Sequence, residues 1–409
     1  MNRGCILAAV LLALSLVAVN SMADEFHYNN ILIGDRASGM GGAYTAVSDD
    51  PGGMYYNPAG IAYSTGKNLS ASVNAYSVSN RTYKSVISGQ DWKRTSSTLL
   101  PNFFGIIQPV GKFKIGFSYA VPDSNQEDQD QKFLRPDLGA THVINFNNKN
   151  DTNLFGPSLA AQVSDSFSLG ATLYVHKRST EAILNNSIIS DTGNGFVWSN
   201  ANTEIDEWGL RPIVGLMWAP MDKLSLGLTF SRTVVLTSDI LTQSTLSTDV
   251  APLPARTFNS YTDKRKYPYQ VTAGVAFFPD SSLLLSGDVS YYSAVEYTLI
   301  NTLNKRDAVI NGALGAEYFI NKKWAVRGGV FTDFASTPKI VNDTSDQFEH
   351  IDLFGSSMTL SHFTKNTSIS CGGSYKFGNG KAKVNGGANG IQDVTANNWT
   401  LFVSSSYSY

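Results

Sequence analysis

The chain has 409 residues, a formal net charge of −2 and 16 % charged residues, well below the roughly 25 % of ordinary soluble domains. This near-neutral balance excludes a nucleic-acid surface built from basic residues. Glycine, serine, asparagine and tyrosine take the place of the missing charges.

Residues 1–23 have the form of a signal peptide. Arg3 supplies a positive charge, residues 6–19 are apolar, and Ser21-Met22-Ala23 is a small-x-small cleavage pattern. The apolar run is too short for an ordinary bilayer-spanning helix, so a retained anchor is the less favoured alternative. Cleavage near Ala23 leaves Cys371 as the one cysteine, which excludes an intrachain disulfide.

Residues 24–66 follow and lack both helical and strand periodicity. The stretch DDPGGMYYNPAGIA (49–62) contains three glycines and two prolines in fourteen residues. Such a composition favours a tight, irregular backbone fold.

From residue 67 onward the sequence predicts β-strands. In KFKIGFSYAV (112–121), apolar side chains alternate with polar or small ones, which is the period of a strand with one apolar face. Fourteen segments of about the length that a tilted membrane strand needs are predicted: 67–77, 98–108, 112–121, 153–163, 167–177, 207–218, 224–232, 268–278, 283–292, 308–319, 324–332, 351–361, 367–377 and 398–409.

The links between these strands alternate between short and long. Short turns such as Pro109-Val110-Gly111 alternate with long polar links, which we expect to be loops: 122–152, 178–206, 233–267, 293–307 and 333–350. This alternation is typical of a transmembrane barrel. We therefore predict an all-β fold, a 14-stranded antiparallel transmembrane β-barrel over 67–409 in the outer membrane of a Gram-negative cell. A secreted β-sandwich is the alternative, but its second face would carry charges rather than Ser, Thr, Gly and Ala.

Aromatic residues fall into two bands, as the two membrane interfaces require. The first band lies beside the short turns (Phe113, Phe167, Trp218, Phe277, Phe319, Trp324), and the second lies toward the long links (Tyr119, Phe230, Tyr291, Tyr292, Phe331). The chain ends in WTLFVSSSYSY, and its terminal Tyr409 resembles the signal that barrel-assembly machinery reads. Outer-membrane lipid and lipopolysaccharide are the expected surroundings.

A barrel of fourteen strands is wider than the eight-stranded barrels that side chains can fill. Residues 24–66 are too irregular to join the wall and long enough to fold back into the lumen. We expect them to form an N-terminal hatch that plugs it.

The segment GDRASGMGGAYTAVSDDPGGMYYNPAGIA (34–62) resembles the N-terminal signature of the FadL/TodX-type outer-membrane transporters of long-chain fatty acids and aromatic hydrocarbons. The matching residues are a glycine-rich stretch, an acidic pair and an Asn-Pro-Ala: Gly39, Gly41, Gly42, Asp49, Asp50, Asn57, Pro58 and Ala59.

The resemblance implies uptake of a hydrophobic small molecule. The ligand would be caught at extracellular loops and passed through the lumen by hatch movement and a kinked third strand that opens the wall. In this chain the third strand is 112–121, where Gly116 would allow a kink at least cost. Barrels of the PorV kind in protein secretion share a similar signature, so a secretion or surface-interaction barrel is the alternative, and a water-filled porin is a further one.

Five charged residues fall on the inward faces of the strands: Lys114, Arg211, Asp288, Glu317 and Arg327. The cations among them would suit a substrate carboxylate, but a network that braces wall and plug is the favoured interpretation. Apolar clusters at 182–189 and 234–241 would form either a capture groove or extensions of strands.

Enzyme motifs, a Walker loop and a CxxC pair are missing from the sequence, so we predict no enzyme activity, no cofactor and no metal site. His176 on an inward face is interpreted as a polar lining residue. The stretch DSNQEDQDQ (123–131) begins like an EF-hand but lacks the glycine and glutamate that one needs, and is expected to be a solvated loop.

Overall fold

The computed structural model describes residues 27–193, 195–250, 253–340, 349–384 and 390–408. The predicted signal peptide, the first residues of the predicted hatch and Tyr409 lie outside this range. The side chains of 73–75 and 100 are also not described.

Fourteen antiparallel strands close into a barrel, in which β18 pairs with β1 from Asn68–Ser408 to Tyr83–Val394. Each contains one of the fourteen predicted segments, or all but its end residues: β1 (Asn68–Ile87), β2 (Gln90–Val110), β3 (Phe113–Arg135), β4 (Ala140–Ser164), β5 (Phe167–Ser190), β6 (Phe196–Met221), β7 (Leu224–Arg232), β10 (Tyr269–Phe277), β11 (Leu283–Tyr292), β14 (Val309–Asn321), β15 (Trp324–Asp333), β16 (His350–Phe363), β17 (Thr367–Ala382) and β18 (Gln392–Ser408). The predicted fold class is confirmed.

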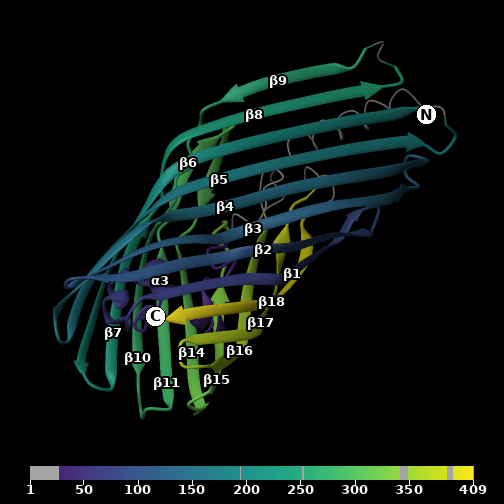
Figure 1. Cartoon of the computed structure of the whole chain (residues 1–409). Helices are drawn as coiled ribbons and strands as arrows, with labels where there is room; N and C mark the ends of the chain where they lie inside the picture. The colour runs from purple at the N-terminus through teal and green to yellow at the C-terminus, as the bar shows by residue number, and fades with distance from the viewer. Residues whose placement is uncertain (1–26, 194, 251–252, 341–348, 385–389, 409) are drawn as a thin grey trace.

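The prediction of long loops is wrong for two of the links. Residues 122–152 and 178–206 continue β3 to β6 as strands, so β4 reaches 25 residues. At about 3.3 Å per residue such a strand is about 80 Å long, far more than a tilted strand needs to cross a bilayer core of about 30 Å. These extensions form a sheet that projects beyond the shorter strands (Figure 1).

Two other links carry additional strands. β8 (Val234–Thr248) pairs with the projecting half of β6, β9 (Ala255–Tyr261) pairs with β8, and β12 (Val295–Leu299) forms a hairpin with β13 (Thr302–Arg306). The stretch 123–131 lies within β3 rather than in a loop. Its polar residues face water on a sheet instead of lipid, which is why the apolar alternation of a membrane strand is missing there.

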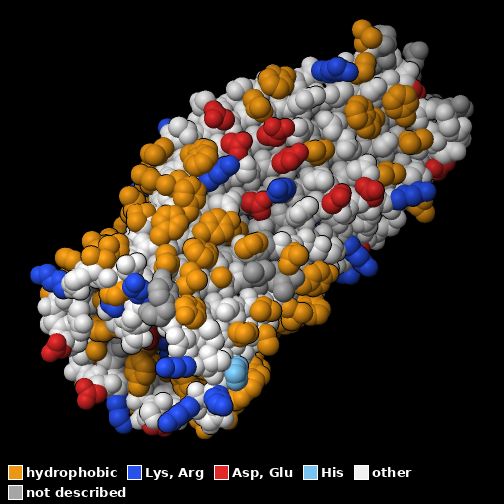
Figure 2. Space-filling view, in the orientation of Figure 1, with side chains coloured by type: hydrophobic (Ala, Val, Ile, Leu, Met, Phe, Trp, Pro, Cys, Tyr) orange, Lys and Arg blue, Asp and Glu red, His pale blue; other side chains and the backbone are white. Residues whose placement is uncertain are grey.

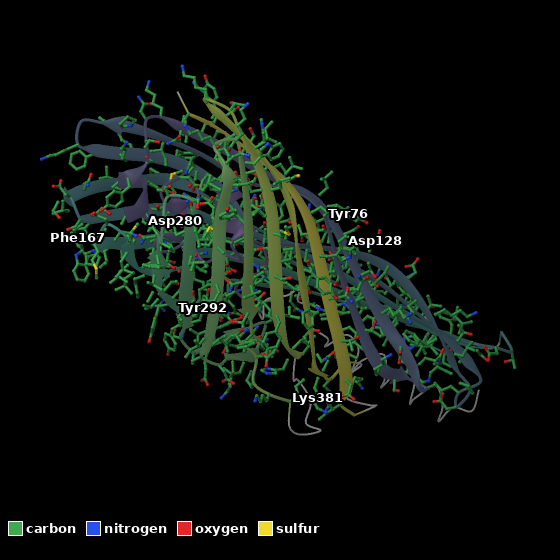
Figure 3. All side chains as sticks on the ribbon, turned by 90° about the horizontal axis from the view of Figure 1, so that it is seen from below. Tyr76, Asp128, Phe167, Asp280, Tyr292 and Lys381 are labelled. Atoms are coloured by element: carbon green, nitrogen blue, oxygen red, sulfur yellow. The ribbon has the colours of Figure 1, made fainter. Side chains whose placement is uncertain are left out.

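The apolar face of each membrane strand points outward. Phe113, Ile115 and Phe117 are exposed on β3, and the residues between them point toward the lumen. Hydrophobic side chains gather over the barrel end of the molecule, whereas acidic side chains appear on the projecting sheet (Figure 2). Phe167, beside a tight turn, lies near one end of the long axis, and Asp128 and Lys381 lie toward the other (Figure 3).

The predicted outer aromatic band needs a correction. Tyr291 is exposed as expected, but Tyr292 and Phe331 are buried. Tyr292 must face the lumen because consecutive residues of a strand point to opposite sides, and its ring stacks on Tyr28 at 4.2 Å between centroids.

Three short helices are found in the described part of the chain: α2 (Asp35–Gly39), α3 (Gly53–Tyr56) and the 3-10 helix η1 (Pro58–Tyr63). None of the helices described is long and apolar enough to cross a membrane.

Candidate functional site

Residues 27–66, called the N-terminal segment below, pack against inward-facing atoms of the wall. Ser168 of β5 donates to the Ala59 carbonyl (2.9 Å) and Ser286 of β11 donates to the Ala43 carbonyl (2.7 Å). Met40 and Met54 are fully buried. The segment thus contacts distant strands of the barrel at once.

Glycines of the wall allow this close contact. A Cβ at Gly170 would overlap the Pro58 backbone, and one at Gly215 would overlap the Asn57 side chain. The same holds for Gly227 against Thr45, Gly315 and Gly329 against Met40, and Gly116 against Met54. A glycine is therefore needed at Gly170, Gly227, Gly315 and Gly329, because backbone atoms of the N-terminal segment occupy the space of the missing side chain.

The Asn-Pro-Ala of the sequence signature organises the segment. Asn57 accepts from the Ala59 N–H (3.1 Å), which caps η1, and Pro58 occupies the first turn, where a missing N–H costs little. The Asn57 amide donates to the carbonyls of Thr45 (2.8 Å) and Leu216 (3.0 Å). One side chain thereby joins two parts of the segment to β6.

The glycine-rich part turns the backbone against the wall. Gly41 and Gly42 have φ of 65° and 83°, a left-handed conformation that favours glycine. Gly39 lies so close to Thr359 of β16 that a Cβ would overlap the threonine hydroxyl.

The acidic pair stays inside the segment. Asp50 accepts from the Gly52 N–H (2.7 Å), and Asp49 accepts from Arg36 (2.6 Å). Burial, together with the neighbouring Asp49 carboxylate, raises the pKa of Asp50 to about 6.

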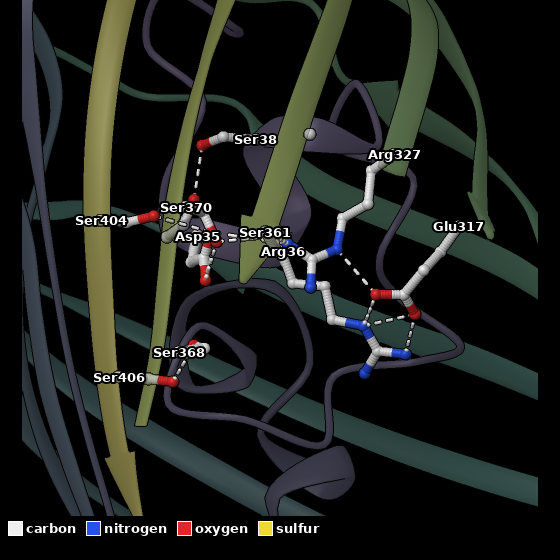
Figure 4. Close-up of polar contacts among 12 residues, drawn as sticks. Asp35, Arg36, Ser38, Glu317, Arg327, Ser361, Ser368, Ser370, Ser404 and Ser406 are labelled. Carbon is white, nitrogen blue, oxygen red and sulfur yellow. Dashed lines mark hydrogen bonds and ion pairs between the residues drawn. The ribbon is translucent and has the colours of Figure 1, made fainter. Parts of the chain in front are cut away.

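A charged network joins α2 to the wall (Figure 4). Arg36 donates to both oxygens of Glu317 on β14 (Nε to Oε1 3.0 Å, Nε to Oε2 2.9 Å). Glu317 also accepts from Arg327 on β15 (2.7 Å), and Arg327 lies 3.6 Å from Asp35. We call Asp35, Arg36, Glu317 and Arg327 the latch.

Two serines complete the latch. Asp35 accepts from Ser370 on β17 (3.0 Å) and from Ser404 on β18 (2.7 Å). α2 is therefore tied to four strands. Asp35 and Arg36 precede Gly39 within the signature, but they are not among the site residues predicted from the sequence.

The other inward charges also contact the N-terminal segment. Lys114 donates to the Ser64 carbonyl (2.7 Å), and Asp288 accepts from the backbone N–H groups of Tyr44 and Thr45 (2.9 Å each). The Arg211 guanidinium lies 5.3 Å from the centroid of the Tyr55 ring. Lys114, Arg211 and Asp288 therefore each contact the N-terminal segment.

The third strand is irregular, but not at Gly116. Gly116 pairs in unbroken register with Ile107 and Ser158. The register shift lies between Ala120 and Asp123, beside Pro122, because a proline has no N–H for the strand ladder.

The pairing of β2 with β3 is interrupted at the same height. Among the described residues the continuous pairing stops after Phe103–Ala120, and the single ladder pair beyond it is Ser96–Glu127. Residues 97–102 therefore lie opposite 121–126 without ladder pairs. We call this interval the wall gap. It lies about ten residues from the tight turn, roughly 23 Å along the barrel axis for a strand tilted by about 45°.

Beyond the wall gap, side chains replace part of the ladder. Gln129 accepts from the Thr95 N–H (3.2 Å) and Gln131 accepts from the Lys93 N–H (3.0 Å). Both glutamines belong to the stretch 123–131.

The N-terminal segment contacts both sides of the wall gap. The Ile31 N–H donates to the Pro122 carbonyl (3.2 Å), and Asn102 donates to the Leu32 carbonyl (3.0 Å). Asn30 also donates to Asp123 (3.1 Å). Residues 30–32 thus bridge the two strands where their own pairing fails.

Cavities lie around the N-terminal segment. An inner cavity of about 70 Å³ and an outer cavity of about 120 Å³ share Tyr28, Tyr55 and Arg211 as lining residues. A third cavity of about 50 Å³ adjoins Asp123, Ser124 and Asn125 of β3.

The apolar clusters at 182–189 and 234–241 lie in strands β5 and β8. Leu184 packs with Trp92, Phe133 and Phe146, and Ile240 packs with Ile205 and others in a separate cluster. These residues line the inner side of the projecting sheet, so both clusters are strand extensions.

His176 has a carboxylate partner. Its Nε2 lies 3.1 Å from Glu207 Oε1, which also accepts from the Tyr267 hydroxyl (2.6 Å). In the part of the chain that the structure describes, these contacts include no serine, and they form no nucleophile–histidine pair.

The fold is similar to that of solved outer-membrane proteins. A Pseudomonas aeruginosa FadL homologue matches with a TM-score of 0.69 at 15 % identity, and the P. putida toluene transporter TodX matches with 0.68 at 12 %. The Ralstonia pickettii toluene transporter TbuX matches with 0.62 at 16 %. Each alignment covers 93 % of this chain and 99 % of the other. The comparison with curated protein sequences found no match.

A sequence profile gives the family. The profile described as "Outer membrane protein transport protein (OMPP1/FadL/TodX)" matches residues 14–260, which is more than half of the chain. Members of this family are transport channels of the outer membrane and not enzymes. The chain therefore belongs to the OMPP1/FadL/TodX family of outer-membrane transport proteins.

Proposed function

We propose that this protein takes up small hydrophobic molecules, either fatty acids or aromatic or aliphatic hydrocarbons, across the outer membrane. Its family consists of transporters for hydrophobic ligands, and two of the similar structures are described as toluene transporters. The ligand enters from the projecting end of the barrel and reaches the cavities above the N-terminal segment.

In this proposal the N-terminal segment is a hatch and the wall gap is the exit. The observation that carries the proposal is the bridge between them: Ile31 bonds to Pro122 of β3, and Leu32 bonds to Asn102 of β2. A hatch that moves must break these bonds and thereby free a stretch of β2 and β3 that lacks ladder pairs. A hydrophobic ligand then passes laterally through the wall gap into the outer leaflet and does not cross the periplasmic end of the plugged lumen.

The surroundings of the barrel follow from the same proposal. Signal peptidase removes the leader near Ala23, and the C-terminal strand with Tyr409 is read by the barrel-assembly machinery. Outer-membrane lipid and lipopolysaccharide cover the apolar band.

Two cysteine pairs in a Cys371→Ser background test the route. Ala43→Cys with Ser286→Cys locks the hatch to β11, where the serine hydroxyl now contacts the Ala43 carbonyl (2.7 Å). Leu99→Cys with Ser124→Cys closes the wall gap in the register of the flanking pairs. Ser356→Cys with Tyr375→Cys joins directly opposite residues of β16 and β17 away from both features and serves as control.

Uptake of labelled toluene and of labelled oleate by cells is measured before and after reduction of the disulfides. We expect both test pairs to stop uptake of the transported ligand until reductant is added, and the control pair to leave it unchanged. Uptake that continues through both locked proteins would refute the hatch and the wall gap as the route.

A further inference from the structure

An open groove crosses the outer surface of the wall, on the side away from the lumen. It has a volume of about 400 Å³, larger than each of the three cavities around the N-terminal segment, and it lies over β17 between β16 and β18. Met358 of β16 and Leu401 of β18 stand beside it and are 63 % and 48 % exposed. The groove therefore opens toward lipid rather than toward the lumen.

The register of the three strands explains the groove. Gly373 of β17 pairs with Met358 on one side and with Leu401 on the other, so a position without a side chain lies between two long ones. Apart from its chain neighbours, a Cβ at Gly373 would have two atoms of the described residues within 4 Å, the Thr400 carbonyl oxygen at 3.0 Å and Leu401 Cδ2 at 3.3 Å. The side toward Met358 is therefore left open.

A second lipid-facing glycine is covered instead. Gly287 of β11 pairs with Val275 of β10 and with Leu314 of β14, and these two neighbours are also exposed. A Cβ at Gly287 would lie 3.1 Å from Leu314 Cδ2 and 3.9 Å from Val275 Cγ1. Side chains from both neighbouring strands thus approach Gly287, whereas Gly373 is approached from the Leu401 side alone. The two glycines are matched positions for a comparison.

Aromatic rings mark how far the groove lies from the short turn between β16 and β17. Tyr375 and Trp399 pair at one end of the groove, and Tyr375 stacks on Phe377 with 5.7 Å between ring centroids. Phe377 lies ten residues after Thr367 at the turn, roughly 23 Å along the barrel axis for a strand tilted by about 45°, and the lipid-facing band of such barrels is about 25 Å tall. The groove, from Gly373 to Tyr375, therefore lies in the half of the band farther from the short turn.

The lining of the groove suits a single flexible apolar chain. None of the nine described lining residues is charged. Stable contacts between proteins need about 20–30 residues on each side, so the groove is too small to account for an interface with a second copy. The amphipathic rings of Tyr375 and Trp399 stand at the end farther from the short turn, as such rings do at a membrane–water interface.

We infer that this groove binds one acyl chain of lipopolysaccharide. In outer-membrane barrels the short turns face the periplasm and the longer links face the outside. The half of the band farther from the short turn therefore lies in the outer leaflet, where lipopolysaccharide is the lipid. The chain runs along β17 over Gly373, between Met358 and Leu401, with its head group beyond Tyr375 and Trp399. This inference goes beyond the proposed function, because the groove is outside the lumen and depends on neither the hatch nor the wall gap.

Lipid analysis of the full-length protein, purified from outer membranes in a mild detergent, tests the inference. Lipopolysaccharide is quantified by mass spectrometry of its 3-hydroxy acyl chains, and phospholipid is measured in the same sample. We expect the parent protein to retain lipopolysaccharide after washing with detergent. Gly373→Leu fills the groove and should lower the retained amount about tenfold, because it displaces about two methylene groups of the bound chain.

Gly287→Leu is the matched control, because it adds the same side chain to the lipid-facing glycine that is already covered. It should leave the retained lipopolysaccharide unchanged. A double change, Met358→Ala with Leu401→Ala, removes both sides of the groove without adding an atom near the Thr400 carbonyl, and it should lower the retained amount to a similar extent. Heat-modifiable migration on gels checks that each variant keeps its barrel.

Retention of phospholipid in place of lipopolysaccharide would overturn the inference, and so would equal retention of lipopolysaccharide by the parent, Gly373→Leu and the double variant. A parent protein that purifies as a dimer and becomes a monomer in Gly373→Leu would also overturn it, because the groove would then belong to a second copy. These results leave the hatch and the wall gap untouched, since their test is uptake by the locked proteins.

Discussion

Removing one partner of the latch should release the hatch. Glu317 is 1 % exposed and Arg36 is 18 % exposed at the side chain, and Glu317 holds both Arg36 and Arg327. Glu317→Ala leaves two arginines in a buried site without their shared carboxylate. Such a loss costs about 3–5 kcal/mol.

The lost free energy affects the docking of the hatch rather than the whole barrel, because the wall strands keep their own backbone hydrogen bonds. The equilibrium between a seated and a displaced hatch should therefore shift by about two to four orders of magnitude. A displaced hatch leaves water in the lumen, so single-channel conductance in planar bilayers is the assay. We expect rare openings for the parent protein and frequent openings for Glu317→Ala.

An exposed ion pair provides the control. Lys381 and Asp393 lie opposite each other on β17 and β18, 3.4 Å apart and more than half exposed. Surface pairs contribute about 0–1 kcal/mol, so Asp393→Asn should leave the conductance unchanged. Closed channels in Glu317→Ala would refute the latch as the element that holds the hatch.

Three further changes test other parts of the structure. Gly215→Ala places a Cβ onto the Asn57 side chain and should lower the melting temperature of the hatch. Gly312→Ala should leave it unchanged, because the nearest atom to the added Cβ is the Asp288 carbonyl oxygen at 3.9 Å. Calorimetry compares the two variants. The pKa of Asp50 is raised from 3.8 to about 6, so its contribution to hatch stability is complete below pH 3.8 and is lost as the pH rises through 6. Openings should therefore increase between about pH 4 and pH 6 and level off above that range, and Asp50→Asn should remove this dependence. Burial lowers the pKa of His142 from 6.5 to about 4. Its contribution to the stability of the projecting sheet is therefore present above pH 6.5 and is lost as the pH falls through 4. The sensitivity of the sheet to protease should rise as the pH falls over that window, and this rise should be absent in His142→Asn.

The membrane strands are readable from the sequence because lipid imposes a strict alternation. Every second residue of 112–121 must be apolar when its neighbour faces a lumen. Outside the bilayer this constraint disappears. The extension of β4 alternates between buried and half-exposed positions, but asparagine and lysine occupy many of them, and local composition alone predicts a loop.

The register shift of the third strand lies away from the predicted Gly116 for a related reason. Gly116 looks like a weak point in a strand because glycine loosens a backbone. In the structure its missing side chain makes room for Met54, a contact between residues 62 positions apart that strand propensity cannot report. Pro122, which has no N–H to donate, carries the irregularity instead.

Arg36 and Asp35 were missed because their roles depend on partners about 280 to 370 residues away. A charge in an irregular segment is usually solvated, and only the barrel topology turns this pair toward β14, β15, β17 and β18. Asn57, Gly41 and Gly42 are indicated by the resemblance to the family signature, and their structural roles are partly local, namely a capped turn and positive φ angles.

Two neighbouring stretches near the start of the N-terminal segment hold different parts of the barrel wall. Residues 30–32 bridge β2 and β3 at the wall gap, while α2, only a few residues later, is tied through the latch to β14, β15, β17 and β18. A segment this short cannot leave one anchor and keep the other without stretching the backbone between Leu32 and Asp35. The latch and the wall gap should therefore open together, so that the lumen is never unplugged while the side exit is still bridged.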